Sequence, residues 1–419
     1  MAATIHGAQI LTQAGVSVLD RVQSAGPGDV SISRDKIYEL GNDKSIGTTT
    51  GVPEVSYSVE SFDVSCEFEC RLIGENPATF PTTPGTNEID FKDALPIDML
   101  SIFKTRKNSD TVETGVISPY LALSSVSYSF GVGDNASQSF SLNGDTELLT
   151  PGQPYYAEIV NTGTGPYTIP RTADKYNDSG RDVYILSVML KDSVTKAYKR
   201  VFFDQAGVTG YTNTSTTFTL PAAEQATYDT ICITYSSSTK VNYDDDGVGP
   251  NGQTVHEGLL VKPAAVQAKD LDVYIGTNDA TPVFTRMISV QNIQATWSVT
   301  MENGEELGNN RFTYTEYDVP DVSGSIGIKP ISVADLADKF SRVTGVPAAE
   351  VIGPNSSVPV PLEMRVRHPD TGVVLKTIYI PDARFDIPGF TGQVNSRLEN
   401  TLNFTSDTGE MFVYNGARV

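Results

Sequence analysis

A repeat constrains this chain more than any other feature of its sequence. Glu39–Asn42 recurs as Glu306–Asn309, and Val52–Ser56 recurs with one conservative change as Val319–Ser323, each at a spacing of 267 positions. Self-similarity at a fixed spacing marks a duplicated structural unit. We therefore predict two copies of one fold within the chain.

The end of the duplicated unit matches as well, at a spacing of 262 positions. The matching residues are Ala136, Phe140, Leu142, Asp145 and Thr146 against Leu398, Leu402, Phe404, Asp407 and Thr408. The matches predict a first repeat over 1–150, a second over 266–419, and a separate unit over 151–265.

Length and composition favour a β-rich chain of several domains. Its 419 residues have room for two to four domains. Hydrophobic residues make up 39% and charged residues 19%, with 35 Gly and 24 Pro, which is typical of a globular β protein and not of a long helical one. The net charge of −21 argues against binding nucleic acid or anionic lipid through a basic face.

Alternation of apolar and polar residues over Glu54–Leu72 predicts one long strand with a bulge near Glu60. The second half of that strand would direct Asp63, Glu67 and Glu69 away from the core.

The chain has three cysteines, and a small, odd number of cysteines does not fit a disulfide framework. On the predicted strand Cys66 and Cys70 would lie about 13 Å apart, beyond the reach of a disulfide. We predict that both are buried free thiols.

Serine alternates with apolar residues in two further segments, which predicts half-exposed antiparallel strands. Ser125, Ser127 and Ser129 flank Val126 and Tyr128, and Ser139, Ser141 and Asn143 flank Phe140 and Leu142. Two segments read as short helices, Leu95–Lys104 and Val333–Val343, one in each repeat. The middle unit shows only strand-like runs separated by turn residues, so we predict an inserted all-β domain.

Catalytic signatures are missing from the sequence. His6, His256 and His368 are isolated, and no nucleophile, paired-carboxylate, zinc or nucleotide motif occurs. We expect no enzyme activity and no cofactor.

One string resembles a calcium loop. Asn242, Asp244 and Asp246, followed by Gly247, match its first, third, fifth and sixth positions, but Gln253 stands where a bidentate Glu belongs. A solvated acidic turn remains the favoured interpretation, with calcium as the alternative.

No stretch is long and apolar enough for a membrane span, and the N-terminus does not resemble a secretory signal. We expect a protein that is made in the cytoplasm and stays out of membranes.

The chain resembles the major tail tube proteins of tailed bacteriophages. The segments that carry the resemblance are Leu19–Ser24, Ile37–Asn42, Val52–Ser58 and Ser137–Asn143. The resemblance implies tandem tail-tube-type β-sandwich domains, each with one short α-helix, in subunits whose strands form a continuous barrel around a lumen. A duplicated chain would form a trimeric, pseudo-hexameric ring, and stacked rings would conduct genome DNA into the host.

The resemblance also implies partners and a location. Rings of this chain would stack on one another in the virion tail after assembly in the host cytoplasm, with a tape measure inside and terminator and tip proteins at the ends. DNA would pass through without specific binding. Because carboxylates repel phosphates, we expect an acidic lumen. The candidates for its wall are Glu54, Asp63, Glu67, Glu69 and Asp321.

Long or terminal segments are candidates for contacts between rings. They are the arm 1–15, the tail 414–419 and the loop Ile73–Lys92, whose candidate contact residues are Gly74, Asn76, Phe80 and Glu88. The inserted domain has no room in a lumen, so we expect it on the tube exterior, which favours a non-contractile, siphophage-type tail.

Two other functions stay open on the sequence. A secreted or surface-displayed β-sandwich adhesin or appendage subunit would suit the acidity and the Thr- and Ser-rich strands. A β-rich carbohydrate-active enzyme is a weaker alternative, because aromatic residues are sparse and no acid pair is recognisable.

Overall fold

The computed structural model describes most of the chain. The described part is residues 10–418 apart from 20, 39–44, 63–64, 78, 105–111, 151, 179–180, 204–209, 225–226, 239–265, 278–280, 305–310, 313, 330–340, 342–357 and 387–399. Strands dominate it, so the prediction of a mainly β fold is confirmed.

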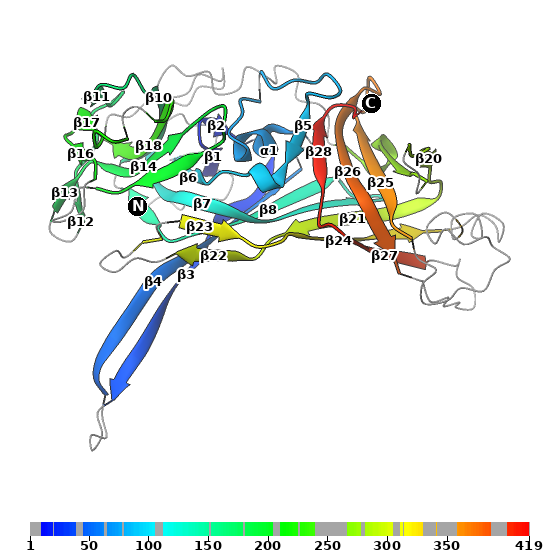
Figure 1. The fold of residues 1–419 in the computed structure, drawn as a ribbon, viewed down its shortest axis with the longest axis horizontal. Coiled ribbons are helices and arrows are strands. Elements are labelled where there is room, and N and C mark those ends of the chain that lie inside the picture. The colour runs from blue at the N-terminus through cyan, green and yellow to red at the C-terminus, as the bar shows by residue number, and fades with distance from the viewer. Residues whose placement is uncertain are drawn as a thin grey trace, which may run out of the picture.

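The elements fall into three runs along the chain (Figure 1). The first run holds β1 (Ile10–Ala14), β2 (Ser17–Val18), β3 (Val22–Tyr38), β4 (Ser45–Ser61), α1 (Glu67–Leu72), β5 (Glu88–Asp90), η2 (Phe91–Asp93), β6 (Ile97–Lys104), β7 (Val112–Gly131), β8 (Ser137–Gly144) and β9 (Leu148–Thr150). The second holds β10 (Gln153–Val160), β11 (Tyr167–Thr168), β12 (Tyr176–Asp178), β13 (Arg181–Val183), β14 (Ile185–Lys191), β15 (Tyr198–Val201), β16 (Thr212–Asn213), β17 (Thr217–Thr219) and β18 (Thr230–Ser237). The third holds η3 (Ala268–Asp270), β19 (Leu271–Ile275), β20 (Thr285–Arg286), β21 (Val290–Ser298), β22 (Met301–Gly304), β23 (Tyr314–Tyr317), β24 (Asp321–Ile328), β25 (Val360–Arg367), β26 (Val374–Phe385), β27 (Asn400–Ser406) and β28 (Phe412–Asn415).

The first and third runs share one pairing pattern. In the first run the antiparallel pairs are β1–β2, β1–β6, β6–β7, β3–β4, β4–β8, β7–β8 and β7–β9. In the third run they are β19–β20, β19–β25, β25–β26, β21–β24, β24–β27, β26–β27 and β26–β28. Each strand of one set has its counterpart in the same place in the other.

The two sets join edge to edge. Strand β7 pairs with β21 from Ser125↔Ser298 to Gly131↔Asn292. The result is one continuous sheet, in the order β3-β4-β8-β7-β21-β24-β27-β26. We call it the central sheet.

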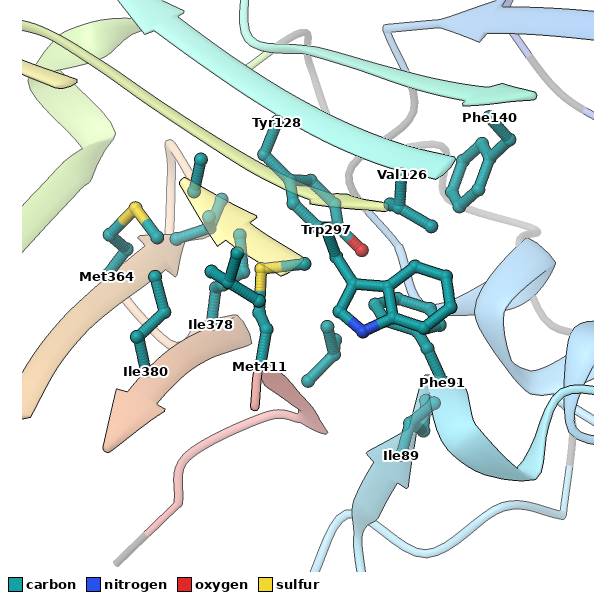
Figure 2. Packing of buried hydrophobic residues seen from close by; sticks show 14 of the residues in the cluster. Ile89, Phe91, Val126, Tyr128, Phe140, Trp297, Met364, Ile378, Ile380 and Met411 are labelled. Carbon is teal, nitrogen blue, oxygen red and sulfur yellow. The ribbon is translucent and has the colours of Figure 1, made fainter. Parts of the chain in front are cut away.

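A shared core covers one face of the central sheet (Figure 2). Trp297 of β21 is 2% exposed, and its ring centroid lies 5.5 Å from that of Phe91. Tyr128 and Phe140, from the first run, belong to the same cluster as Met364 and Ile378, from the third. Because the two halves bury their apolar residues in one cluster, they form a single packed body.

The predicted long strand over Glu54–Leu72 is wrong in its second half. Strand β4 ends at Ser61, and Glu67–Leu72 form the helix α1, where the Cys70 amide donates to the Cys66 carbonyl at 2.9 Å. Apolar residues at 66, 68, 70 and 72 fit the period of a strand. Nearly every face of the short helix is buried, however, so the alternation does not distinguish a strand from a helix. Cys66 and Cys70 are buried and free, as predicted, although they lie one helical turn apart.

The predicted helix over Leu95–Lys104 is also wrong. Ile97–Lys104 form strand β6, which lies between β1 and β7. Met99, Leu100 and Ile102 are fully buried, because both faces of this strand are covered. A strand buried on both faces lacks the period of two, so its short apolar run resembles a buried helix. The second predicted helix, Val333–Val343, lies outside the described residues except for Ser341, which is helical.

The middle run forms its own sheets. Strands β10-β18-β14-β15 pair in one sheet and β11-β17-β16 in another, around a cluster of buried residues drawn from 155–235 alone. The larger sheet packs against β6 and β7 through Tyr156, Met189 and Cys232. Figure 1 shows these strands at the end of the molecule opposite β20 and β25.

Candidate functional site

The two faces of the central sheet differ in chemistry. On β4, Val55, Tyr57 and Val59 are at most 2% exposed and point into the core. Ser56 and Ser58, between them, are exposed on the other face. The same alternation runs through the other strands of this sheet, so one face is apolar and covered while the other is polar and open. We call the open one the polar face.

Cross-strand pairing aligns the side chains of the polar face in rows. One row crosses all eight strands through Ser24, Glu60, Ser139, Ser127, Thr296, Ser323, Thr405 and Arg384. A second contains Gly26, Ser58, Ser141, Ser125, Ser298 and Asp321, and a third contains Ser137, Ser129, Gln294, Ser325 and Asn403. Hydroxyl and amide groups therefore make up most of this surface.

Hydrogen bonds link neighbouring side chains within the rows. The hydroxyls of Ser127 and Thr296 lie 3.0 Å apart, across the junction of the two halves. Ser24 Oγ donates to Glu60 Oε2 at 3.3 Å. The sequence reveals these hydroxyls through the alternation of serine with apolar residues, but not that one sheet would bring them all to one face.

Charges are sparse on the polar face. Glu54, Glu60 and Asp321 are exposed there, Glu54 in the middle of β4, Glu60 near its end and Asp321 at the start of β24. Arg384 is paired with Asp407 through an Nη2–Oδ2 contact of 2.5 Å. Hydrogen bonding from Arg384 holds the pKa of the exposed Asp407 carboxyl below its ordinary value. The described rows thus carry carboxylates and one neutralised cation.

The predicted acidic positions divide into three groups. Glu54 and Asp321 are exposed on the polar face, and Asp63 lies outside the described residues. Glu67 and Glu69 are 5% and 0% exposed, so the expectation that they face away from the core is wrong. They turn inward because the chain leaves the sheet after Ser61 and forms α1 on its apolar side.

Strand β3 is an edge of the central sheet. In the described part of the chain its only strand partner is β4. Its counterpart β21 pairs on both sides, with β24 and with β7. The outer edge of β3 therefore corresponds to the edge of β21 that pairs with β7.

The outer halves of β3 and β4 continue beyond the sheet as a two-stranded ribbon (Figure 1). Val30 and Ile32 on this ribbon are 46% and 40% exposed. Apolar side chains held in the open on a projecting hairpin are typical of a segment that contacts another molecule.

Some of the residues predicted to contact neighbouring rings instead make contacts within the chain. Gly74, Asn76 and Glu88 are exposed, whereas Phe80 is half-buried against the main core. Glu88 lies in β5, which pairs with β28, and its Oε2 accepts from Tyr414 Oη at 2.6 Å. The loop and the tail thus bind each other, and the described part of the N-terminal arm forms β1 inside the fold.

The described residues contain no group of three or more His, Cys, Asp or Glu placed to hold a metal ion. The calcium candidates Asn242, Asp244 and Asp246 lie outside the described residues, as do His6 and His256. His368 accepts the backbone N–H of Asp370 at 3.1 Å within a turn. No helix in the described part is long and apolar enough to cross a membrane.

Comparison with known proteins gives only partial likenesses. No protein-family model matches the chain, and no curated protein matches it. Similar solved structures include the tail of an empty gene transfer agent particle (16% identity, TM-score 0.23, covering 34% of this chain and 94% of that one). A baseplate of the anti-feeding prophage matches at 16% identity and a TM-score of 0.22, over 34% of this chain and 91% of its own. A native gene transfer agent virion matches at 16% identity and a TM-score of 0.22, over 34% and 94%.

Proposed function

We propose that this chain is the structural subunit of a bacteriophage tail tube, three copies of which close into a ring. The observation that carries the proposal is the β7–β21 junction, where the two halves of the chain already pair in the way that successive subunits would. The three units 1–150, 151–265 and 266–419 are then two ring-forming domains and one insertion.

The edges of the central sheet support ring closure. β3 stands at one end of the sheet and the β26–β27 pair at the other. A contact between two different edges is heterologous, so repeating it generates a closed ring or an open filament. Repetition of the internal junction would add the β3 edge of one copy to the far end of the sheet in the next. Closure would remove exposed strand edges, which otherwise promote aggregation.

The polar face suits the wall of a DNA conduit. Neutral hydroxyls and amides with a few carboxylates offer the phosphate backbone no cation to bind, so they would not retain DNA through counterion release. The single arginine in the described rows is already paired with Asp407. The lumen we propose is therefore mainly hydroxylated, with Glu54, Glu60 and Asp321 as its acidic positions.

The remaining segments suit contacts outside the lumen. The β3–β4 ribbon is the strongest candidate for a contact between stacked rings, because its apolar residues are exposed. The inserted sheets lie on the same side of the central sheet as α1, since Lys196 pairs with Glu75 just after that helix. They would form the exterior of a non-contractile tube in the virion tail, with tape measure, terminator and tip proteins as further partners.

Electron microscopy of the purified full chain tests the proposal. We expect trimeric rings or hollow tubes. Isolated rods would instead favour an adhesin, and cleavage of host glycans would favour an enzyme.

An edge variant tests which strand closes the ring. Ala25 on β3 is half-buried in one copy, whereas its counterpart Ile293 is 1% exposed because β7 covers it. Ala25→Lys should therefore leave a folded single chain that forms no rings, since ring closure would bury the new charge. Val194→Lys, at a site that is 86% exposed in the turn between β14 and β15, is the matched control and should assemble normally. Normal rings from folded Ala25→Lys protein would contradict β3 as the closing edge.

A further inference from the structure

Three polar side chains meet in the core between the two halves of the chain. Lys376 of β26, Glu69 of α1 and Gln138 of β8 are 1%, 0% and 3% exposed. Lys376 Nζ donates to Glu69 Oε1, and it donates to Gln138 Oε1 at 2.8 Å. Tyr128 Oη also donates to Glu69 Oε1, at 2.8 Å.

Glu69 is placed to exchange a proton with Lys376, because its Oε1 accepts directly from Nζ in a buried site. Separated charges are costly where water is excluded, and a proton can pass directly from Nζ to the carboxylate that it contacts. Among the described residues Glu69 Oε2 is buried without a hydrogen-bond partner.

The geometry places a nucleophile beside an electrophile. Because Gln138 Cδ is bonded to Oε1 at about 1.23 Å, Lys376 Nζ lies within about 4 Å of that carbon. A small rotation of either side chain would bring it to the separation of about 3 to 3.5 Å from which such attacks proceed. Burial keeps water, the competing nucleophile, away.

We propose that Lys376 and Gln138 form an intramolecular isopeptide bond, with Glu69 as the proton carrier. Glu69 takes a proton from Lys376 Nζ, and the neutral amine attacks Gln138 Cδ. The Nζ–Cδ bond forms and the Cδ–Nε2 bond breaks as Glu69 gives its proton to the departing Nε2. Nζ then passes its second proton to Glu69, which ends protonated. The amide and the amine thus become a secondary amide and one molecule of ammonia, with no oxidant or reductant needed.

The site has room for the leaving group. A cavity of about 10 Å³ is lined by Gln138, Glu67 and Phe68, among others. That volume approaches what one water-sized molecule needs. Ammonia released from Gln138 could therefore leave through this space without unfolding the core.

The bond would tie the first half of the chain to the second across 238 positions. It would hold β8 against β26, beside the junction that joins the halves of the central sheet. A cross-link of this span removes much conformational entropy from the unfolded chain, so it would raise the stability of the subunit.

Mass spectrometry of the unmodified full chain tests the proposal directly. The denatured protein should weigh less than its sequence by one ammonia, and a tryptic digest should contain one branched peptide that joins the Gln138 and Lys376 segments. Trypsin should not cleave after Lys376. A full sequence mass, with separate linear peptides and cleavage after Lys376, would overturn the proposal.

A pair of variants separates the role of Glu69 from a structural one. Glu69→Gln keeps the shape of the side chain but cannot carry the proton, so its mass should equal its sequence mass. Glu410→Gln removes a carboxylate from an exposed pair with Lys92 and should keep the cross-link. A branched peptide from Glu69→Gln protein would contradict Glu69 as the proton carrier.

Discussion

Single residues secure the contact between the inserted sheets and the rest of the molecule. Arg200 of β15 forms two hydrogen bonds with Asp145, at 2.6 and 3.0 Å, and both side chains are at most 3% exposed. Arg200 Nη1 also donates to the Phe312 carbonyl at 3.1 Å, and the Phe312 amide donates to Asp145. One arginine thus joins all three runs of the chain.

This ion pair gives the stability of the protein a defined dependence on pH. Burial raises the pKa of Asp145, but the charge and hydrogen bonds of Arg200 outweigh it and hold that pKa below its ordinary value. Because the folded pKa is depressed, the stabilisation is fully present above the unfolded value of about 3.9 and is lost as the pH falls through the folded value.

Asp145→Asn should cost about 3 to 5 kcal/mol of unfolding free energy at pH 7, because it leaves Arg200 buried without its counter-charge. Urea denaturation from pH 7 to pH 2 measures the effect. The difference from the wild type should shrink below about pH 4. A difference that stays constant over this range would show that the carboxylate charge is not what stabilises the contact.

At the scale of elements, the sequence predicts strands well where one face is buried and the other is open. Val55, Tyr57 and Val59 lie inward as their alternation indicates, and so do Val126 and Tyr128. Prediction fails where no face is open. Strand β6 and helix α1 are each covered almost all round, so neither shows the period that would identify it. The sequence therefore predicted a helix where β6 lies and a strand where α1 lies.

The candidate site was predictable in part for the same reason. Serine alternation identified half-exposed strands, and Glu54 and Asp321 lie at matched positions of β4 and β24 in the two halves. The joining of the two halves into one sheet depends on the β7–β21 pairing between residues more than 150 positions apart, such as Val126 with Trp297, and no local pattern encodes it. The polar face and the open edge of β3 therefore emerge only from the fold.

Shortening the β3–β4 ribbon tests its role as an element. Ile32 and Pro53 face each other across the two strands, so a short Asn-Gly turn can replace everything beyond them, with Val30→Ser and Ile32→Ser added to remove the exposed apolar side chains. We expect the unfolding free energy to change by less than about 0.5 kcal/mol, because these exposed residues contribute little to the core. Rings should still form but should no longer stack, which electron microscopy would reveal.

Deleting residues 74–88 provides the contrasting case. This loop is tied to the C-terminal strand through Asn87, whose Nδ2 donates to the Asn415 and Ala417 carbonyls at 2.9 and 2.8 Å. Its loss should therefore lower the stability of the single chain.

Normal tubes from the shortened-ribbon variant would contradict a stacking role for the ribbon.

At the scale of the whole molecule, one junction explains most of the architecture. The halves share a pairing pattern, a core and a continuous sheet, and the sheet ends in two different edges. The net charge of −21 keeps such a subunit soluble, while the polar face itself carries few charges. Repulsion of DNA would then be a property of the whole ring, and the surface facing the DNA would be mainly hydroxyl and amide.

Cryo-electron microscopy of the assembled particle tests the central claim most directly. We predict a ring of three chains in which the β3 edge of each copy pairs with the next copy, and in which Ser127, Thr296 and Ser323 line the channel. A ring with this face on its outer surface, or with the β3 edge unpaired, would contradict the account.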